Sequence, residues 1–186
     1  MVQVSRGTRL AENSVPLLLR APRNRVYLPV RKRHLRFLVQ VTKIELEAFF
    51  RRNPRQVSRY RNRFLAAALC QGAALHYLNR KNGVKDFDIH LFYVQHPKHK
   101  QMSRAVKPLI MEVPDFGIRE IDFIRTVVPE RFAQGADHSV SGVLQRFLQR
   151  RPTSNARFLT EKAVIGLIPE HLFARVVWPI HDNSNR

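Results

Sequence analysis

The chain has 186 residues, 44% of them apolar, which is enough to bury a core within one medium-sized domain. Its formal net charge of +19, from 33 Lys and Arg against 14 Asp and Glu, exceeds what solubility requires and indicates a polyanionic partner such as nucleic acid. The single cysteine, Cys70, excludes an internal disulfide and a multi-cysteine zinc site.

The same composition leads to an expected location. One cysteine is typical of a reducing compartment, and no apolar run approaches the roughly 18 to 20 residues of a membrane span. The N-terminus also lacks the apolar centre and the small-residue cleavage site of a secretory signal. We therefore expect a cytoplasmic protein with no membrane partner. The alternative explanation of the charge is a genome-wide preference for arginine or a ribosome-like environment.

Residues 1–40 are predicted to be a basic, partly flexible arm. Residues 1–65 hold 16 of the 33 basic residues and only 3 of the 14 acidic ones. Residues 25–30 are expected to be a short extended piece, and the basic run 31–36 would either lie along a phosphate backbone or form a solvated loop. The candidate contacts to nucleic acid are Arg31, Lys32, Arg33, Arg59 and Arg63.

Residues 41–136 are predicted to form the core. Thr42 and Glu45 have the spacing of a capping box and predict a helix start, and Asn53 followed by Pro54 predicts a second start. Apolar residues at spacings of three and four place an amphipathic helix after Pro54, with arginines on its other face. Residues 66–70 are apolar throughout, so they suit either the end of this helix or a short buried strand.

The rest of the core is predicted to alternate strands with a short helix. Gly72 breaks the apolar run, residues 73–79 suit two helical turns, and Asn82 with Gly83 marks a turn. Strands are expected at residues 86–94, 109–113 and 118–128. Residues 137–186 are expected to be a helical segment packed on the core. Two apolar stripes predict its helices: Val140, Val143, Leu144, Phe147 and Leu148, then Phe158, Leu159, Ala163, Val164 and Leu167.

Carboxylates gather on the predicted strands. Asp86 and Asp88 are two residues apart, so they would project from the same face of a strand, where they repel each other unless a cation lies between them. Glu120 and Asp122 share one face of the later strand, and either could supply a third carboxylate. An exposed strand start, neutralised by nearby lysine or arginine, would produce the same Asp pair.

Taken together, these residues resemble the polymerase-beta-like nucleotidyltransferase superfamily over about residues 54–128. The resemblance rests on Gly72-Ala73 after an apolar segment, a short helix, Asp86-Phe-Asp88 opening a strand, and Asp122 on a later strand. It implies an α+β fold with a small mixed nucleotidyltransferase-like sheet flanked by helices, to which the C-terminal part adds helices.

The resemblance also implies roles for individual residues. Asp86, Asp88 and Asp122 would be catalytic and would bind Mg²⁺ or Mn²⁺, while Gly72, Ala73 and Lys85 would contact the phosphates of a nucleoside triphosphate. Mg²⁺ prefers hard oxygen ligands and keeps substrate phosphates in its coordination shell, which suits such a set. The chain departs from the pattern at Ala73, where a serine hydroxyl is usual, so phosphate binding would depend on backbone groups.

Three functions are consistent with these observations. The first is a metal-dependent nucleotidyltransferase that moves a nucleotide from a nucleoside triphosphate to an acceptor such as RNA or tRNA; some small members of the superfamily are toxins that modify tRNA or proteins. The second is a catalytically inactive protein with the same fold that binds nucleic acid, as Ala73 and the net charge suggest. The third is a structural protein whose arginine surface meets an acidic protein partner.

Overall fold

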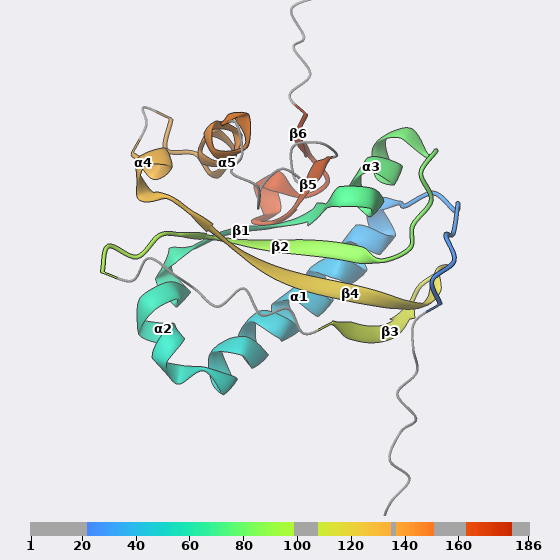
Figure 1. Cartoon of the computed structure of the whole chain (residues 1–186), viewed down its shortest axis with the longest axis horizontal. Helices are drawn as coiled ribbons and strands as arrows, with labels where there is room; N and C mark the ends of the chain where they lie inside the picture. The colour runs from blue at the N-terminus through green and yellow to red at the C-terminus, as the bar shows by residue number, and fades with distance from the viewer. Residues whose placement is uncertain (1–21, 99–107, 135–136, 151–162, 180–186) are drawn as a thin grey trace, which may run out of the picture.

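The computed structural model describes residues 22–98, 108–134, 137–150 and 163–179, and every structural statement below concerns these residues. They form a six-stranded mixed sheet with helices on both faces, which confirms the expected α+β class (Figure 1). The elements are α1 (Lys32–Arg52), α2 (Pro54–Tyr60), η1 (Arg61–Arg63), β1 (Phe64–Cys70), α3 (Gln71–Asn79), β2 (Phe87–Val94), β3 (Leu109–Val113), β4 (Gly117–Val128), α4 (Glu130–Ala133), α5 (Val140–Gln149), β5 (Val164–Ile168), η2 (Glu170–Leu172) and β6 (Val176–Trp178).

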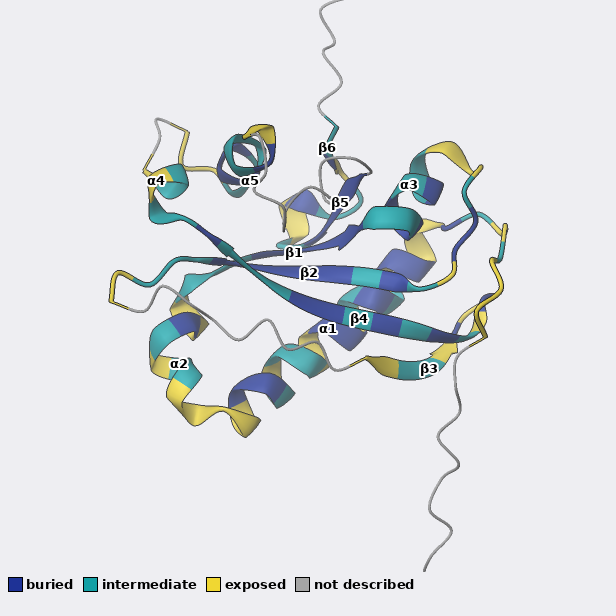
Figure 2. Cartoon of the chain, viewed as in Figure 1, coloured by how far each residue is buried: buried dark blue, intermediate teal, exposed yellow. Residues whose placement is uncertain are grey.

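The strand order across the sheet is β3-β4-β2-β1-β5-β6. Only β2 and β4 pair in parallel; each of the other neighbouring pairs is antiparallel. The central strands β1 and β2 are buried along most of their length, whereas the edge strand β3 is largely accessible (Figure 2). A central strand covered on both faces reads as a nearly continuous apolar run, which explains why residues 66–70 were ambiguous in sequence.

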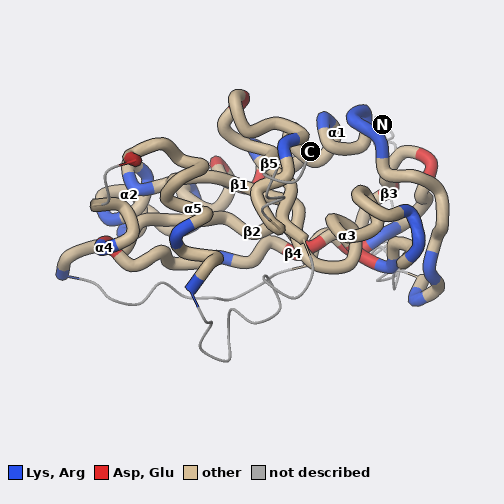
Figure 3. Tube along the Cα trace, turned by 90° about the horizontal axis from the view of Figure 1, so that it is seen from above, with Lys and Arg blue, Asp and Glu red and all other residues tan. Residues whose placement is uncertain are grey.

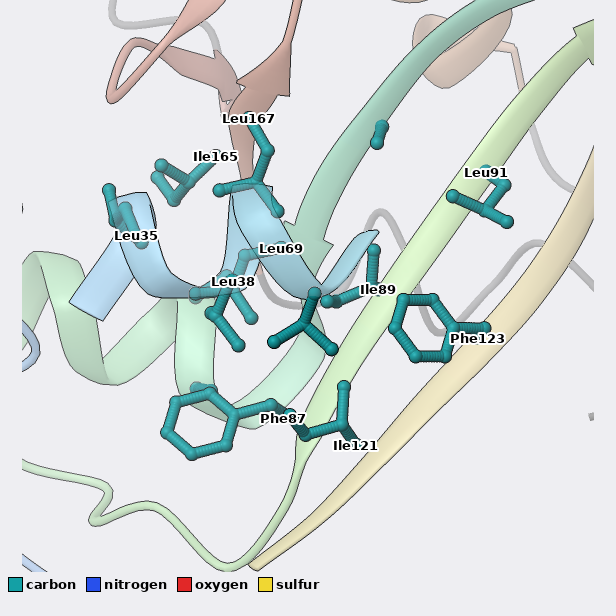
Figure 4. Close-up of a cluster of buried hydrophobic side chains, with 14 of the residues drawn as sticks. Leu35, Leu38, Leu69, Phe87, Ile89, Leu91, Ile121, Phe123, Ile165 and Leu167 are labelled. Atoms are coloured by element: carbon teal, nitrogen blue, oxygen red, sulfur yellow. The ribbon is translucent and has the colours of Figure 1, made fainter. Parts of the chain in front are cut away.

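Two apolar cores lie on opposite faces of the sheet. On one face α1 packs Leu35 and Leu38 against Leu69 of β1 and Ile89 of β2 (Figure 4). On the other face α5 packs Leu144 and its neighbours against Ala66 and Ala68 of β1 and against β6. Since side chains alternate between the faces of a strand, β1 and β2 supply both cores at once.

The helix expected to begin at Thr42 begins ten residues earlier, at Lys32. Its first turn is closed by His34, whose Nδ1 accepts a hydrogen bond of 2.9 Å from the backbone N–H of Arg31. Thr42 lies buried in the middle of the helix and donates to the carbonyl oxygen of Leu38 at 2.6 Å. Residues 32–40, assigned to a flexible arm, therefore belong to a helix that packs on the sheet. Histidine is an unusual capping residue, so the sequence pattern pointed to the threonine instead.

The C-terminal part is only partly helical. Helix α5 confirms the first of its two apolar stripes, and Ser139 caps it by accepting a 3.0 Å hydrogen bond from the N–H of Gly142. The second stripe was predicted to be a helix, and this is wrong for Val164 and Leu167, which lie in strand β5. The positions Phe158 and Leu159 lie outside the described residues. Residues 164–168 are apolar and mostly β-branched, and they are buried because β5 joins the sheet beside β1.

No helix in the described part of the chain combines the length and the apolar character needed to cross a lipid bilayer.

Gly166 in β5 tests the tight contact between this strand and the turn that follows it. A Cβ at Gly166 would lie 2.2 Å from the backbone oxygen of Leu172, which cannot move without displacing the turn. We expect Gly166→Ala to lower the free energy of unfolding by about 2–3 kcal/mol, measured by chemical denaturation. Gly72→Ala is the matched control because a Cβ there meets no atom within 4 Å. Equal stability of the two variants would contradict the packing described here.

Candidate functional site

The junction of β1 and α3 is where the predicted phosphate-binding residues lie. Strand β1 ends at Cys70 and α3 begins at Gln71 with no loop between them. Gln71 makes the turn with a φ of 58°, in the left-handed region that glycine normally occupies. No side chain caps the start of α3, so its first N–H groups remain available to another acceptor. Such a helix start favours anions, phosphate in particular.

A cavity of about 310 Å³ lies beside this helix start. It brings together five of the residues singled out in sequence: Gly72, Ala73, Lys85, Asp86 and Asp88. The remaining lining residues are Arg25, Gln71, Leu75, Asn82 and Gly83. The β1–α3 junction and the loop that leads into β2 thus form one concave surface with carboxylates, cations and a helix start.

Each of the two cavity carboxylates has a hydrogen-bond donor nearby. The Nε2 of Gln71 donates to Oδ1 of Asp88 at 2.9 Å, and the Nζ of Lys85 lies 3.0 Å from Oδ2 of Asp86. Sequence reasoning did not single out Gln71 or Arg25. Gln71 directly precedes the glycine, a place that could have drawn attention to it, but its contact with Asp88 spans 17 residues of sequence and has no local signal.

Asp122 lies on the strand beside Asp88. In the parallel pairing of β2 with β4, Asp88 is in register with Asp122, so both side chains project from the same face of the sheet. Glu120 is opposite Ile110 of β3. Of the two candidates for a third carboxylate, Asp122 is therefore the direct neighbour of Asp88, although it is not among the residues that line the cavity.

The surroundings of Asp122 are acidic. Its pKa is raised from 3.8 to about 6, first by partial burial and then by the nearby carboxylates of Glu120 and Asp86, while Lys85 acts in the opposite direction. Burial and like charge both penalise the ionised form of a carboxyl group. The raised pKa indicates that the carboxylates of β4 and of the cavity influence one another, as candidate members of one site would.

The carboxylates do not by themselves form a metal cage. Within the described ranges, no group of three or more His, Cys, Asp or Glu residues is arranged to hold a metal ion. Mg²⁺, however, usually binds to one or two carboxylates and completes its shell with water and substrate phosphates. Asp86 and Asp88, which line one cavity beside an open helix start, fit an ion that arrives with a phosphate; they do not fit one held by protein alone.

The predicted nucleic-acid contacts are divided between two places. Arg31, Lys32 and Arg33 lie at the start of α1, whereas Arg59 and Arg63 lie beyond its end, so a 21-residue helix, about 30 Å long, separates them. Figure 3 shows basic positions at both of these ends. Arg33 pairs with Asp115, and Arg63 donates to the carbonyl oxygen of Gln95 at 2.8 Å. None of the five residues lines the cavity.

Comparisons of the chain with models of protein families, with curated proteins and with solved structures found no match.

The raised pKa of Asp122 predicts that the stability of the protein depends on pH. The folded state binds the Asp122 proton more tightly than the unfolded state, so this carboxyl group reduces stability as pH rises from about 4 to about 6. Allowing for solvent screening of a half-buried group, we expect about 1 kcal/mol. Asp122→Asn should remove this loss, so the variant gains stability relative to the parent chain between pH 4 and pH 7 in urea denaturation.

Glu47→Gln is the control for this measurement. Glu47 is an exposed carboxylate on α1 that pairs with Arg61 at 2.9 Å, remote in sequence from the cavity and not part of its lining. Its stability difference from the parent should not show the same rise between pH 4 and pH 7. If the difference in stability between Asp122→Asn and the parent chain did not change between pH 4 and pH 7, the acidic environment inferred for Asp122 would be contradicted.

Proposed function

We propose that the chain is a metal-dependent nucleotidyltransferase that binds a nucleoside triphosphate in the cavity beside α3. The observation that carries the proposal is the meeting of the uncapped start of α3, at Gln71 and Gly72, with Asp86 and Asp88 in one cavity, next to Asp122 on the parallel strand. Anion-binding N–H groups and a carboxylate pair within one cavity are what a metal-bound triphosphate requires.

The order of the elements supports the same proposal. A strand, a short helix whose second residue is Gly72, a turn at residues 80–86 that ends with Asp86, and a central strand whose second residue is Asp88 follow one another directly. The neighbouring parallel strand β4 carries the third carboxylate, Asp122, in register with Asp88. This arrangement, a mixed sheet flanked by helices, is the one that the resemblance to nucleotidyltransferases implies.

In this proposal each residue has a defined task. The first N–H groups of α3 donate to phosphate oxygens, and Lys85 and Arg25, which also line the cavity, neutralise their charge. Asp86 and Asp88 would hold the ion, which supplies charge neutralisation of the phosphates and aligns them with the acceptor. Asp122, in register with Asp88, accepts a proton from the attacking hydroxyl as a general base.

Ala73 is compatible with this proposal in one respect. It is 1% exposed and packs into the core below α3, so its side chain does not project into solvent. Its contribution to phosphate binding is the backbone N–H. A hydroxyl at this position would have to reach the phosphate from a buried site. In this chain the phosphate would instead be bound by the backbone N–H groups at the start of α3.

The inactive alternative, a protein of this fold that binds nucleic acid without transferring a nucleotide, is supported by a specific observation as well. No three-carboxylate group in the described part of the chain is arranged to hold a metal ion, and such a protein would not need one. Transfer of label from an α-labelled nucleoside triphosphate distinguishes the two functions. Binding of the nucleotide with no transfer to any acceptor would favour the inactive alternative.

The first test uses the mutual dependence of ion and nucleotide. Because Asp86 and Asp88 alone offer too few ligands, Mg²⁺ and each nucleoside triphosphate should bind weakly alone and at least tenfold more tightly together, measured by calorimetry. Asp88→Asn keeps an oxygen that can accept from Gln71 but loses the charge, and it should abolish this mutual enhancement. Glu47→Gln is the matched control and should leave it intact. Tight binding of Mg²⁺ without nucleotide would contradict the proposed site.

The second test uses the open space at Gly72. A Cβ at this residue meets no atom within 4 Å, so Gly72→Ala and Gly72→Val should fold normally, and the alanine variant should gain up to about 0.5–1 kcal/mol. In the proposed complex that space holds phosphate. We expect nucleotide binding to weaken progressively from glycine to alanine to valine, by tenfold or more for valine, while the denaturation midpoint does not fall in either variant. Unchanged binding in the valine variant would exclude phosphate from the start of α3.

A further inference from the structure

An exposed aromatic side chain lies a few residues from the candidate cavity. Tyr27 is 62% exposed, yet its ring packs on its neighbours: it lies so close over Gly83 that a Cβ there would be 3.1 Å from two of its ring carbons, and it makes a T-shaped contact with His76, with the ring centroids 6.4 Å apart. A fixed aromatic ring with an accessible surface is a binding feature rather than part of a core.

The segment that carries Tyr27 is attached to the loop before β2. Val26 and Val84 exchange two backbone hydrogen bonds of 2.9 and 2.7 Å. The buried ring of His76 adds two more, since its Nδ1 accepts from the N–H of Gly83 at 3.0 Å and its Nε2 donates to the carbonyl oxygen of Leu28 at 3.1 Å. Residues 22–28 and 80–86 are thus neighbours in space, and the second segment includes Lys85 and Asp86 of the cavity.

These two segments are rich in exposed cations. Together with Tyr27 they form what we call the basic strip: Arg23, Arg25, Tyr27, Arg80, Lys81 and Lys85. Among the described residues, Lys85 is the only member with a carboxylate partner, Asp86. Arg25 donates to the carbonyl oxygen of Asn82 at 2.9 Å, and both Arg25 and Lys85 also line the cavity. The strip therefore continues directly into the candidate site.

Arg80 is an informative member of the strip. It ends α3 with a φ of 58°, the left-handed conformation in which glycine or asparagine costs least. An arginine at this position has no packing role that would explain it, because the residue is exposed. Arg80→Gly consequently removes a charge from the strip without a penalty to the fold.

We propose that the basic strip binds a single strand of nucleic acid, with its cations on the phosphates and a base stacked on Tyr27. Cations alone would suit any polyanion, but a fixed, exposed ring beside them suits unstacked bases, which duplexes and acidic peptides do not offer. A strand on the strip has one end at the cavity, which makes it the nucleotide acceptor. That last assignment rests on the proposed function, whereas the binding of the strand does not.

The charge test compares two triple variants. Fluorescence anisotropy follows labelled single-stranded oligonucleotides of RNA and of DNA, without nucleotide or metal, over a series of salt concentrations. Arg23→Gln/Arg80→Gly/Lys81→Gln should weaken binding at least tenfold and reduce the slope of log affinity against log salt by about 2. The control Lys43→Gln/Arg51→Gln/Arg55→Gln removes three exposed cations from α1 and α2 and should change affinity less than threefold. Equal losses of affinity in the two triple variants would overturn the assignment of the basic strip as the binding surface.

The stacking test concerns Tyr27. Tyr27→Phe keeps the ring and should bind like the parent chain, whereas Tyr27→Ala should lose about tenfold for single strands. A duplex of the same sequence and polyglutamate serve as probes that offer charge without unstacked bases, and they should bind less tightly and be indifferent to Tyr27→Ala. Binding of polyglutamate as tight as that of the oligonucleotide, or no effect of Tyr27→Ala on the oligonucleotide, would overturn the assignment to nucleic acid.

The RNA and DNA arms separate the two sources of the strand, since tighter binding of RNA would indicate contacts to the 2′-hydroxyl. The anisotropy assay contains no nucleoside triphosphate, so absence of strand binding would overturn the proposal for the basic strip and leave the proposed function untouched. Failure of the calorimetric test of Mg²⁺ and nucleotide overturns the proposed function alone.

Discussion

The parallel register between β2 and β4 is the constraint on which both the core and the candidate site depend. The pairing that puts Asp88 beside Asp122 on one face also puts Ile89 beside Phe123 on the other face, under α1. A shift of one residue would turn the carboxylates into the apolar core and the core residues toward the site. The burial of apolar side chains under α1 therefore fixes the register that keeps Asp88 and Asp122 side by side, despite the repulsion between their carboxylates.

The acidic site is unusual in a protein with a net charge of +19. Only 14 acidic residues are present in the whole chain, and Asp86, Asp88, Glu120 and Asp122 are four of them. Partial burial, and then the nearby carboxylates of Glu120 and Asp86, raise the pKa of Asp122 to about 6, which reduces the stability of the folded state at neutral pH. Carboxylates that lower the stability of the folded state are expected where they bind a cation or take part in proton transfer. The surrounding cations of the basic strip provide the opposite field, which attracts a polyanion toward the same place.

The segment before α1 links these two features. Residues 22–28 contribute Arg25 to the cavity and Tyr27 to the basic strip, and they are joined to the loop before β2 through His76 and Val84. The ring of His76 accepts at one nitrogen and donates at the other, so the neutral imidazole satisfies both contacts. The placement of Lys85 and Asp86 thus depends on an interaction between segments almost 60 residues apart in sequence.

The sequence by itself determined the local parts of this structure. The end of the apolar run, the short helix that contains Gly72, the strand that begins near Asp86 and the strand that carries Asp122 all follow from turn residues and from side-chain periodicity, which act over a few residues. The turn itself is made one residue earlier than the glycine indicated, by Gln71. The excess of basic residues also predicted a polyanionic partner, although the five arginines and lysines chosen for it lie at opposite ends of α1. Periodicity could not separate strand from helix at residues 164–167, because an apolar run suits either.

Tertiary structure decided everything that depends on contacts between distant segments. The parallel pairing of β2 with β4, the cap on α1 by His34, the contact of Gln71 with Asp88 and the position of Arg25 at the cavity have no signal in the local pattern. Each arises from packing or hydrogen bonding between residues whose separation along the chain carries no information about their separation in space. Composition and local pattern therefore predicted an acidic pair and a basic chain, while the fold determined which carboxylate stands beside the pair and which cations border it.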